Sequence, residues 1–100
     1  MGTPFDILSN EFKVLGLIFA SEKANISLYQ KTIAKRLKGH VSPNTVTQSI
    51  NRLFDLGLVN AQWTKIDGSR WARVYSVTGE GTSLAESIYS HSKDEFDSLL

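Results

Sequence analysis

The sequence contains no cysteine among its 100 residues. This absence excludes a disulfide framework, a zinc site with cysteine ligands, an iron–sulfur cluster and a catalytic thiol. Long apolar runs are also missing, and the first residues carry no basic cluster, so we expect neither a transmembrane span nor a signal peptide. These absences favour a cytoplasmic protein.

Histidine is scarce, because the chain contains only His40 and His91. Neither residue has a companion at a metal-ligand spacing, and the sequence contains no P-loop, nucleophile elbow or glycine-rich dinucleotide motif. We therefore predict that the protein is not an enzyme and has no metal site and no cofactor.

Acidic residues are absent between Lys23 and Phe54, although five basic residues lie in that stretch. Residues 1–78 carry ten Lys/Arg and five Asp/Glu, whereas residues 79–100 carry one Lys and five acids. The net charge of +1 therefore conceals a basic part and an acidic part. This asymmetry indicates a polyanionic partner, and the alternative is an ordinary solvated surface with its counter-charges elsewhere.

The spacing of apolar residues predicts a first helix over residues 4–20, with Thr3 as its N-cap and Pro4 at its first position. Its buried stripe would contain Phe5, Leu8, Phe12, Leu15 and Phe19. Residues 21–25 are polar and indicate a loop, and residues 26–28 are a candidate short strand.

Two further helices joined by a tight turn are predicted over residues 28–57. Gly39 would end the first of them, and Ser42 with Pro43 would begin the second. Two runs rich in β-branched and aromatic residues follow over residues 58–78, with a turn at Asp67, Gly68 and Ser69. They predict a hairpin, or wing. A last helix is expected from about residue 80 to residue 100.

Three stretches of the chain resemble the winged helix-turn-helix transcription regulators of the PadR and MarR type. Residues 42–59 resemble the recognition helix and its exit into the wing, residues 67–75 the basic wing tip and returning strand, and residues 76–81 the opening of the final helix. The resemblance covers about residues 26–85 of a chain that we expect to form a single domain over residues 1–100. It implies a mainly α, α+β fold, with a two- or three-stranded wing sheet and a C-terminal dimerisation helix.

The face of the third helix opposite its apolar residues is rich in amides and hydroxyls, a composition suited to the major groove. Our candidate base-reading residues are Asn44, Thr45, Gln48, Asn51 and Arg52. The candidates for contacts to the DNA backbone are Lys31, Lys35, Lys38 and Ser42, and those for the wing are Lys65, Ser69, Arg70 and Arg73. A solvated helix face is the alternative.

Trp63 and Trp71 are predicted to be cross-strand neighbours that stabilise the hairpin. Arg73 is predicted to stack on Trp71, Trp63 or Tyr75. A stacking plate for a planar effector is the alternative, but we expect no small-molecule effector. A single-stranded nucleic-acid binder would also need such aromatics on an open platform.

The apolar stripe of the last helix continues beyond what one small domain needs. The resemblance implies that terminal helices pair two copies, and the candidate interface residues are Phe5, Phe12, Leu84, Ile88, Tyr89 and Phe96. The alternative is packing within one protomer. The sequence thus predicts a homodimeric regulator, more specifically a repressor, that binds a pseudo-palindromic double-stranded DNA operator. The alternative function is a protein–protein interaction module within a larger transcription or replication assembly.

Overall fold

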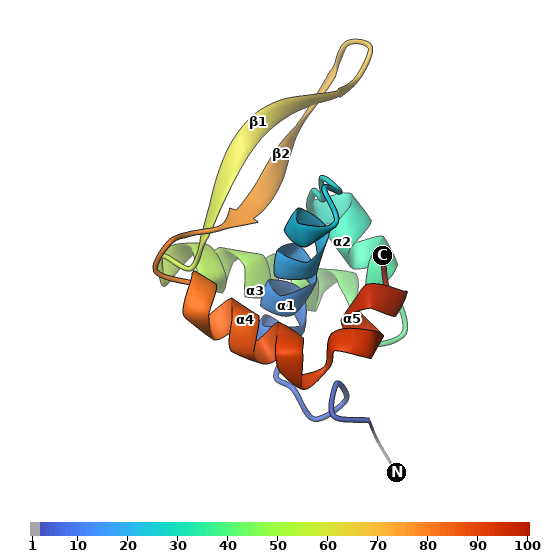
Figure 1. Ribbon diagram of the computed structural model, residues 1–100. Coiled ribbons are helices and arrows are strands. Elements are labelled where there is room, and N and C mark those ends of the chain that lie inside the picture. The colour runs from blue at the N-terminus through green and yellow to red at the C-terminus, as the bar shows by residue number, and fades with distance from the viewer. Residues whose placement is uncertain (1–2) are drawn as a thin grey trace.

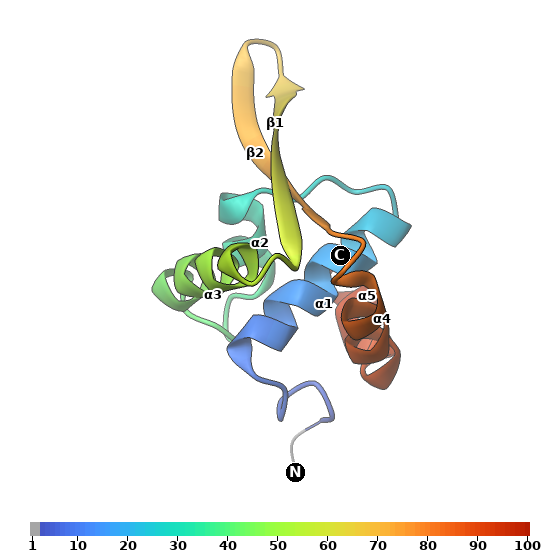
Figure 2. The ribbon, with the colours of Figure 1, turned by 90° about the vertical axis from the view of Figure 1, so that its left-hand side faces the viewer.

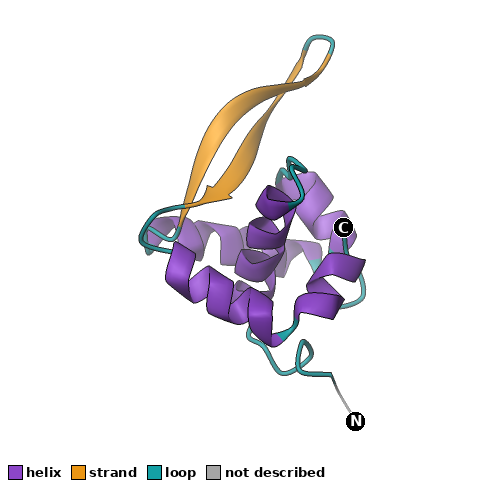
Figure 3. Ribbon diagram, viewed as in Figure 1, coloured by secondary structure: helices purple, strands orange, loops and turns teal. Residues whose placement is uncertain are grey.

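The computed structural model describes residues 3–100, which form five α-helices and a two-stranded antiparallel hairpin (Figures 1 and 3). The elements are α1 (Asn10–Lys23), α2 (Gln30–Arg36), α3 (Pro43–Asp55), β1 (Val59–Asp67), β2 (Arg70–Val77), α4 (Thr82–His91) and α5 (Lys93–Ser98). This arrangement is the predicted mainly α, α+β winged helix-turn-helix fold. The hairpin projects from the helical body and lengthens the molecule to 45 Å, against 28 and 24 Å in the other two directions.

The central helix of the body is α1, which lies between α3 on one side and α4 and α5 on the other (Figure 2). Its middle contains consecutive buried apolar residues, among them Val14, Leu15, Leu17 and Ile18. A helix that is apolar on most of its sides must be covered on most of its sides. The helices around α1 supply that cover.

The first helix begins six residues later than predicted, at Asn10 instead of Pro4. Ser9 is the N-cap and accepts a hydrogen bond from the Phe12 amide at 3.2 Å. Before it the chain makes turns, in which the Asp6 carboxylate accepts a hydrogen bond from the Thr3 amide at 2.9 Å. The short polar side chains of this segment therefore form local hydrogen bonds with the backbone, and these turns replace the helix that the apolar spacing predicts.

The same helix also continues further than predicted, because residues 21–23 are its last turn and not a loop. Ser21 is buried, and its hydroxyl donates to the Ile18 carbonyl at 2.7 Å. The predicted strand at residues 26–28 is reduced to a single bridge between Tyr29 and Val74, next to a hydrogen bond from the Tyr75 amide to the Leu28 carbonyl.

Within the helix-turn-helix unit, α3 follows the prediction, whereas α2 begins later than predicted and ends at Arg36, three residues before Gly39. Ser42 caps α3 by accepting a hydrogen bond from the Thr45 amide at 3.3 Å, and Pro43 is the first helical residue. Gly39 and Gly57 follow α2 and α3 with φ angles of +90° and +75°, which glycine adopts without steric cost. Val46, Ile50 and Leu53 point into the core, as their spacing predicts.

The predicted last helix is broken into α4 and α5 at Ser92, whose φ and ψ are −137° and 43°. The break turns Phe96 back into the core, where its ring meets Phe5 edge-on with the ring centroids 5.1 Å apart. Gly16 of α1 leaves the space for this ring, since a Cβ at that position would overlap it. The C-terminal segment is therefore two short helices that cover α1.

Candidate nucleic-acid interface

The outward face of α3 presents the amides of Asn44, Gln48 and Asn51, all of which are exposed. The side-chain hydrogen bonds of α3 and its cap, within residues 3–100, are made instead by Ser42, Thr45, Thr47 and Arg52. Because the three amides keep their donors and acceptors available, they are suited to base edges in a major groove.

Arg52 lies at the edge of this face and forms an ion pair with α1. Its Nη1 is 2.9 Å from Oε1 of Glu11, and its side chain is 70% exposed. An exposed pair of this kind contributes about 0–1 kcal/mol. The pair is therefore weak enough to be exchanged for another partner of Arg52. Thr45, on the same edge, accepts a hydrogen bond from the Ser42 hydroxyl at 2.8 Å.

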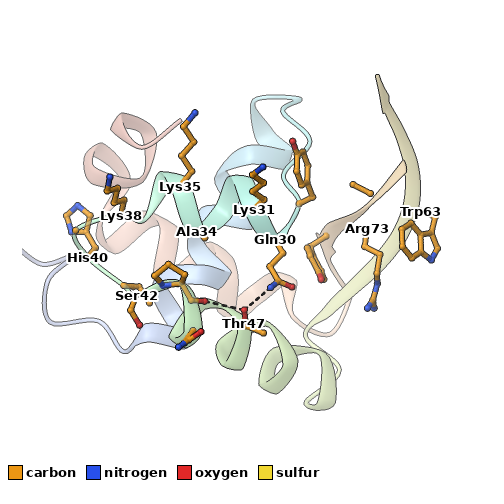
Figure 4. A pocket seen from close by; sticks show the side chains of 17 residues that line it. Gln30, Lys31, Ala34, Lys35, Lys38, His40, Ser42, Thr47, Trp63 and Arg73 are labelled. Atoms are coloured by element: carbon orange, nitrogen blue, oxygen red, sulfur yellow. Dashed lines mark hydrogen bonds between the residues drawn. The ribbon is translucent and has the colours of Figure 1, made fainter. Parts of the chain in front are cut away.

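A concavity of about 1150 Å³ lies between α2, the start of α3 and the lower part of the hairpin (Figure 4). The four residues predicted to contact a DNA backbone, Lys31, Lys35, Lys38 and Ser42, all line it. Asn44 and Arg73 line it as well, so the fold gathers predicted groups from three elements around one hollow. The remaining base-reading candidates lie outside the concavity.

Two lining residues that the sequence analysis did not single out connect α2 to α3. Nε2 of Gln30 donates a hydrogen bond to Oγ1 of Thr47 at 2.7 Å, and this hydroxyl donates to the Pro43 carbonyl at 3.2 Å (Figure 4). The two residues are 17 positions apart in the sequence. The spacing of apolar residues along one helix does not predict a hydrogen bond between side chains of two different helices.

The wing residues divide into a tip and a base. Lys65, Ser69 and Arg70 are exposed near the tip, where Arg70 lies 3.6 Å from the carboxylate of Asp67. Arg73 lies nearer to the body, and its guanidinium carbon is 5.7 Å from the centre of the Phe54 ring and 5.9 Å from that of Tyr75. Arg73 therefore joins β2 to α3, and Phe54 is a further residue that sequence reasoning missed.

No protein-family profile matches the chain, and no curated protein matches it either. Among solved structures, the chain is similar to a mutant of ZitR from Lactococcus lactis, with a TM-score of 0.64 and 21% sequence identity. The match covers 92% of this chain and 57% of the ZitR chain. The chain has the winged-helix fold. It spans less than two thirds of ZitR's length, and at this identity the likeness extends to the fold alone.

The candidate dimer interface requires a correction at four of its six residues. Phe5, Ile88, Tyr89 and Phe96 are 1%, 5%, 6% and 0% exposed, because they pack in the core of their own protomer. The broken C-terminal segment turns these apolar side chains inward. Phe12 is partly buried against the same core, and Leu84 remains 36% exposed.

Helices α4 and α5, which carry most of the C-terminal acids, lie across α1 from α3. Figure 2 places α3 and α4 with α5 on opposite sides of α1. The end of α5 nevertheless contacts α2, because Nη1 of Arg36 donates a hydrogen bond to the Leu99 carbonyl at 3.2 Å. The charge division of the sequence is therefore a spatial division between α3 and the C-terminal helices, and it does not extend to α2.

Three of the groups with perturbed pKa values, Tyr89, Asp97 and Glu22, connect elements of the body. Tyr89 donates a hydrogen bond to the Asp97 carboxylate at 2.6 Å, which with burial raises the pKa of Tyr89 to about 12. The same hydrogen bond lowers the pKa of Asp97. Burial raises the pKa of Glu22, whose carboxylate accepts a hydrogen bond from the Val77 amide at 3.0 Å. None of these three groups lines the concavity, so their titration belongs to the stability of the fold.

Within residues 3–100 there is no cluster of three or more His, Asp or Glu side chains placed to hold a metal ion. No helix in the same part of the chain has the length and hydrophobicity required to cross a bilayer.

Proposed function

We propose that this protein binds double-stranded DNA sequence-specifically and regulates transcription. The observation that carries the proposal is the exposed amide face of α3 beside a concavity lined by three lysines, Lys31, Lys35 and Lys38. Asparagine and glutamine amides match the adenine edge in the major groove, and lysines match the phosphates on either side. The amino-terminal end of α3 adds its backbone amides to the phosphate contacts.

The side chains divide into three roles in this proposal. The base-reading residues are Asn44, Thr45, Gln48, Asn51 and Arg52, and the backbone-contacting residues are Lys31, Lys35, Lys38 and Ser42. In the wing, Lys65, Ser69 and Arg70 reach a minor groove or its phosphates, and Arg73 holds the wing against α3.

The finer form of the proposal is a homodimeric repressor on a pseudo-palindromic operator, as the family resemblance implies. A two-fold dimer would set two copies of α3 about one DNA turn apart. Because four of the original interface residues pack in the core, the pairing surface must use exposed groups such as Leu84 and Ile7, which is 77% exposed. Sedimentation equilibrium tests this form. A monomer at all concentrations, also with DNA present, would contradict it.

The direct test of DNA binding is fluorescence anisotropy of a labelled duplex titrated with the protein at increasing salt. We expect affinity to fall steeply and linearly with the logarithm of the salt concentration, because bound lysines release counterions from the phosphates. No binding at micromolar protein and about 50 mM salt would overturn the proposal. The protein-interaction module would then be the better explanation.

Specificity is tested by Gln48→Ala and Arg52→Ala after an operator has been selected from a random duplex pool. Each substitution should cost about 1–3 kcal/mol on the selected site and much less on random DNA, since it removes contacts to bases. Gln62→Ala is the matched control, because Gln62 is an exposed amide on the wing and not on α3. Equal losses on both kinds of DNA would exclude base reading.

A further inference from the structure

The outer half of the wing carries both tryptophans, together with Lys65 and Arg73, on one face of the hairpin. The register pairs Trp63 with Arg73 and Lys65 with Trp71. Directly paired residues, and residues two apart on one strand, point to the same side of a sheet. These four residues therefore share a surface, which we call the tryptophan face. The cross-strand tryptophan pair expected from the sequence is consequently a diagonal pair.

The same face has a different role nearer to the body, where Val59 and Tyr75 are buried in the core. The opposite face of the strands carries Asn60, Gln62, Thr64, Ala72, Val74 and Ser76, and it carries the charge of Arg70 at the tip, where Arg70 pairs with Asp67. Between the body and the irregularity that follows Lys65, the tryptophan face contains no acid. Both tryptophans and two cations, Lys65 and Arg73, thus lie on the surface that continues outward from the concavity, which Trp63 and Arg73 also line.

Both indole rings are open to solvent, since Trp63 is 64% and Trp71 is 60% exposed. Within residues 3–100 neither ring takes part in an aromatic pair or lies under a cation, because Arg73 stacks on Phe54 and Tyr75 instead. The rings therefore contribute little to the core. Large exposed aromatics of this kind are typical of binding surfaces.

We propose that the tryptophan face binds unpaired bases of a single-stranded nucleic acid, an activity separate from duplex binding by α3. Indole rings stack on the flat faces of bases, and neighbouring lysine and arginine contact the phosphates between them. Diagonal positions on two strands lie about 7–8 Å apart, a distance that successive bases of an extended strand can follow. A duplex offers no such access, because its base faces are covered by stacking within the helix.

The positive charge of the surroundings supports a nucleic acid as the occupant. Lys65 and Arg73 belong to the tryptophan face, and Lys31 and Lys35 line the adjoining concavity. A strand bound on the wing would continue along these cations toward α2. An uncharged apolar partner would gain no binding energy from these four cations.

The two tryptophans of the chain both lie on the wing, so intrinsic tryptophan fluorescence reports on this surface alone. The test titrates the full chain with a short oligothymidylate at low salt and follows the quenching of that emission. An abasic oligonucleotide of the same length is the control, because it keeps the phosphates and lacks the bases. We expect quenching by oligothymidylate and clearly weaker binding of the abasic strand.

Variants assign the binding to the rings. Trp63→Ala and Trp71→Ala should each weaken the binding of a labelled oligothymidylate by roughly 5- to 100-fold, as expected for the loss of one base stack. Trp63→Phe and Trp71→Phe should retain part of the affinity, and Gln48→Ala should retain all of it. Because both rings are exposed, circular dichroism should report an unchanged fold for every variant.

Three results would overturn the inference. They are no binding of oligothymidylate at low salt, equal binding of the abasic strand, and alanine variants that weaken duplex binding as much as single-strand binding. The third result would assign the tryptophans to the duplex interface. Binding of the single strand without any binding of duplex DNA would support this inference and overturn the proposed function, so the two failures are distinguishable.

Discussion

Arg73 connects the wing to the aromatic end of α3. Its guanidinium lies over Phe54 of α3 and Tyr75 of β2, and each cation–π contact contributes about 0.5–1 kcal/mol at an exposed position. Arginine suits this place because its planar group stacks on a ring, whereas the lysine ammonium is a compact point charge.

We expect Arg73→Ala to lower the free energy of unfolding by about 1 kcal/mol and to weaken duplex binding. Arg73→Lys keeps the charge but loses the planar stack, so it should remain close to Arg73→Ala in stability and closer to the native chain in DNA affinity. Urea unfolding and anisotropy measure the two quantities. If Arg73→Lys is as stable as the native chain, the stacking role is wrong.

Tyr89 connects α4 to α5 through its hydrogen bond to Asp97, and its pKa is raised to about 12. A raised pKa means that the neutral phenol is favoured in the folded state. Its contribution is fully present below the unfolded pKa of about 10 and is lost as the pH rises from about 10 toward 12. The lowered pKa of Asp97 acts in the opposite range, where its contribution is lost as the pH falls through the folded-state pKa.

Tyr89→Phe should therefore lower the thermal midpoint at neutral pH, since it removes this hydrogen bond. The difference from the native chain should shrink both above pH 10 and in strong acid. Differential scanning calorimetry over this pH range measures it. A difference that is constant from acid to alkali would assign the effect to packing and not to the hydrogen bond.

At the scale of elements, the position of α5 depends on close contact between Phe96 and Gly16 of α1. Gly16→Ala places a Cβ within the volume of the ring, so either Phe96 leaves the core or the two helices separate. Overpacking of this kind costs about 1–3 kcal/mol. We expect a loss of that size in chemical denaturation, with the helical circular dichroism preserved.

Gly79→Ala is the matched control, because a Cβ at Gly79 meets nothing within 4 Å. Its stability should differ little from that of the native chain. Equal losses for Gly16→Ala and Gly79→Ala would contradict the argument, because they would trace both effects to backbone propensity.

At the scale of the whole molecule, charge is divided between opposite sides of α1. The lysines of α2 and the amino-terminal part of α3 border the concavity, and α4 and α5, with their acidic residues, lie across α1 from α3. In the proposed complex this arrangement brings lysines to the phosphates and keeps the acids of α4 and α5 away from them. It predicts an orientation of the bound protein in which α4 and α5 face solvent.

Lys35→Ala should weaken binding to every duplex by a similar factor and reduce the slope of log affinity against log salt by about one unit. Lys93→Ala removes the same charge from α5, where Lys93 lies 3.3 Å from Asp97, and should leave the slope unchanged. Anisotropy titrations at several salt concentrations provide both slopes. A slope that changes equally for the two variants would exclude the predicted orientation.

Local signals in the sequence were sufficient for α3 and for the hairpin. A serine–proline start, a terminal glycine and apolar residues at helical spacing act within a few residues, so they define α3 without reference to the rest of the chain. The same kind of signal predicted the outward amides Asn44, Gln48 and Asn51. It also singled out Lys31, Lys35 and Lys38 as candidate contacts to a DNA backbone, and these three lysines line the concavity.

Contacts between distant residues decided what local signals could not. An apolar stripe specifies which side of a helix is buried but not which surface covers it, so Phe96 was equally compatible with a dimer and with its own core. The space above Gly16 decided that Phe96 packs in its own core. The Gln30–Thr47 hydrogen bond, the stacking of Arg73 on Phe54 and the diagonal register of the tryptophans likewise depend on how separate elements meet. The sequence determined the elements and their charge, whereas tertiary packing decided which side chains remain free to bind.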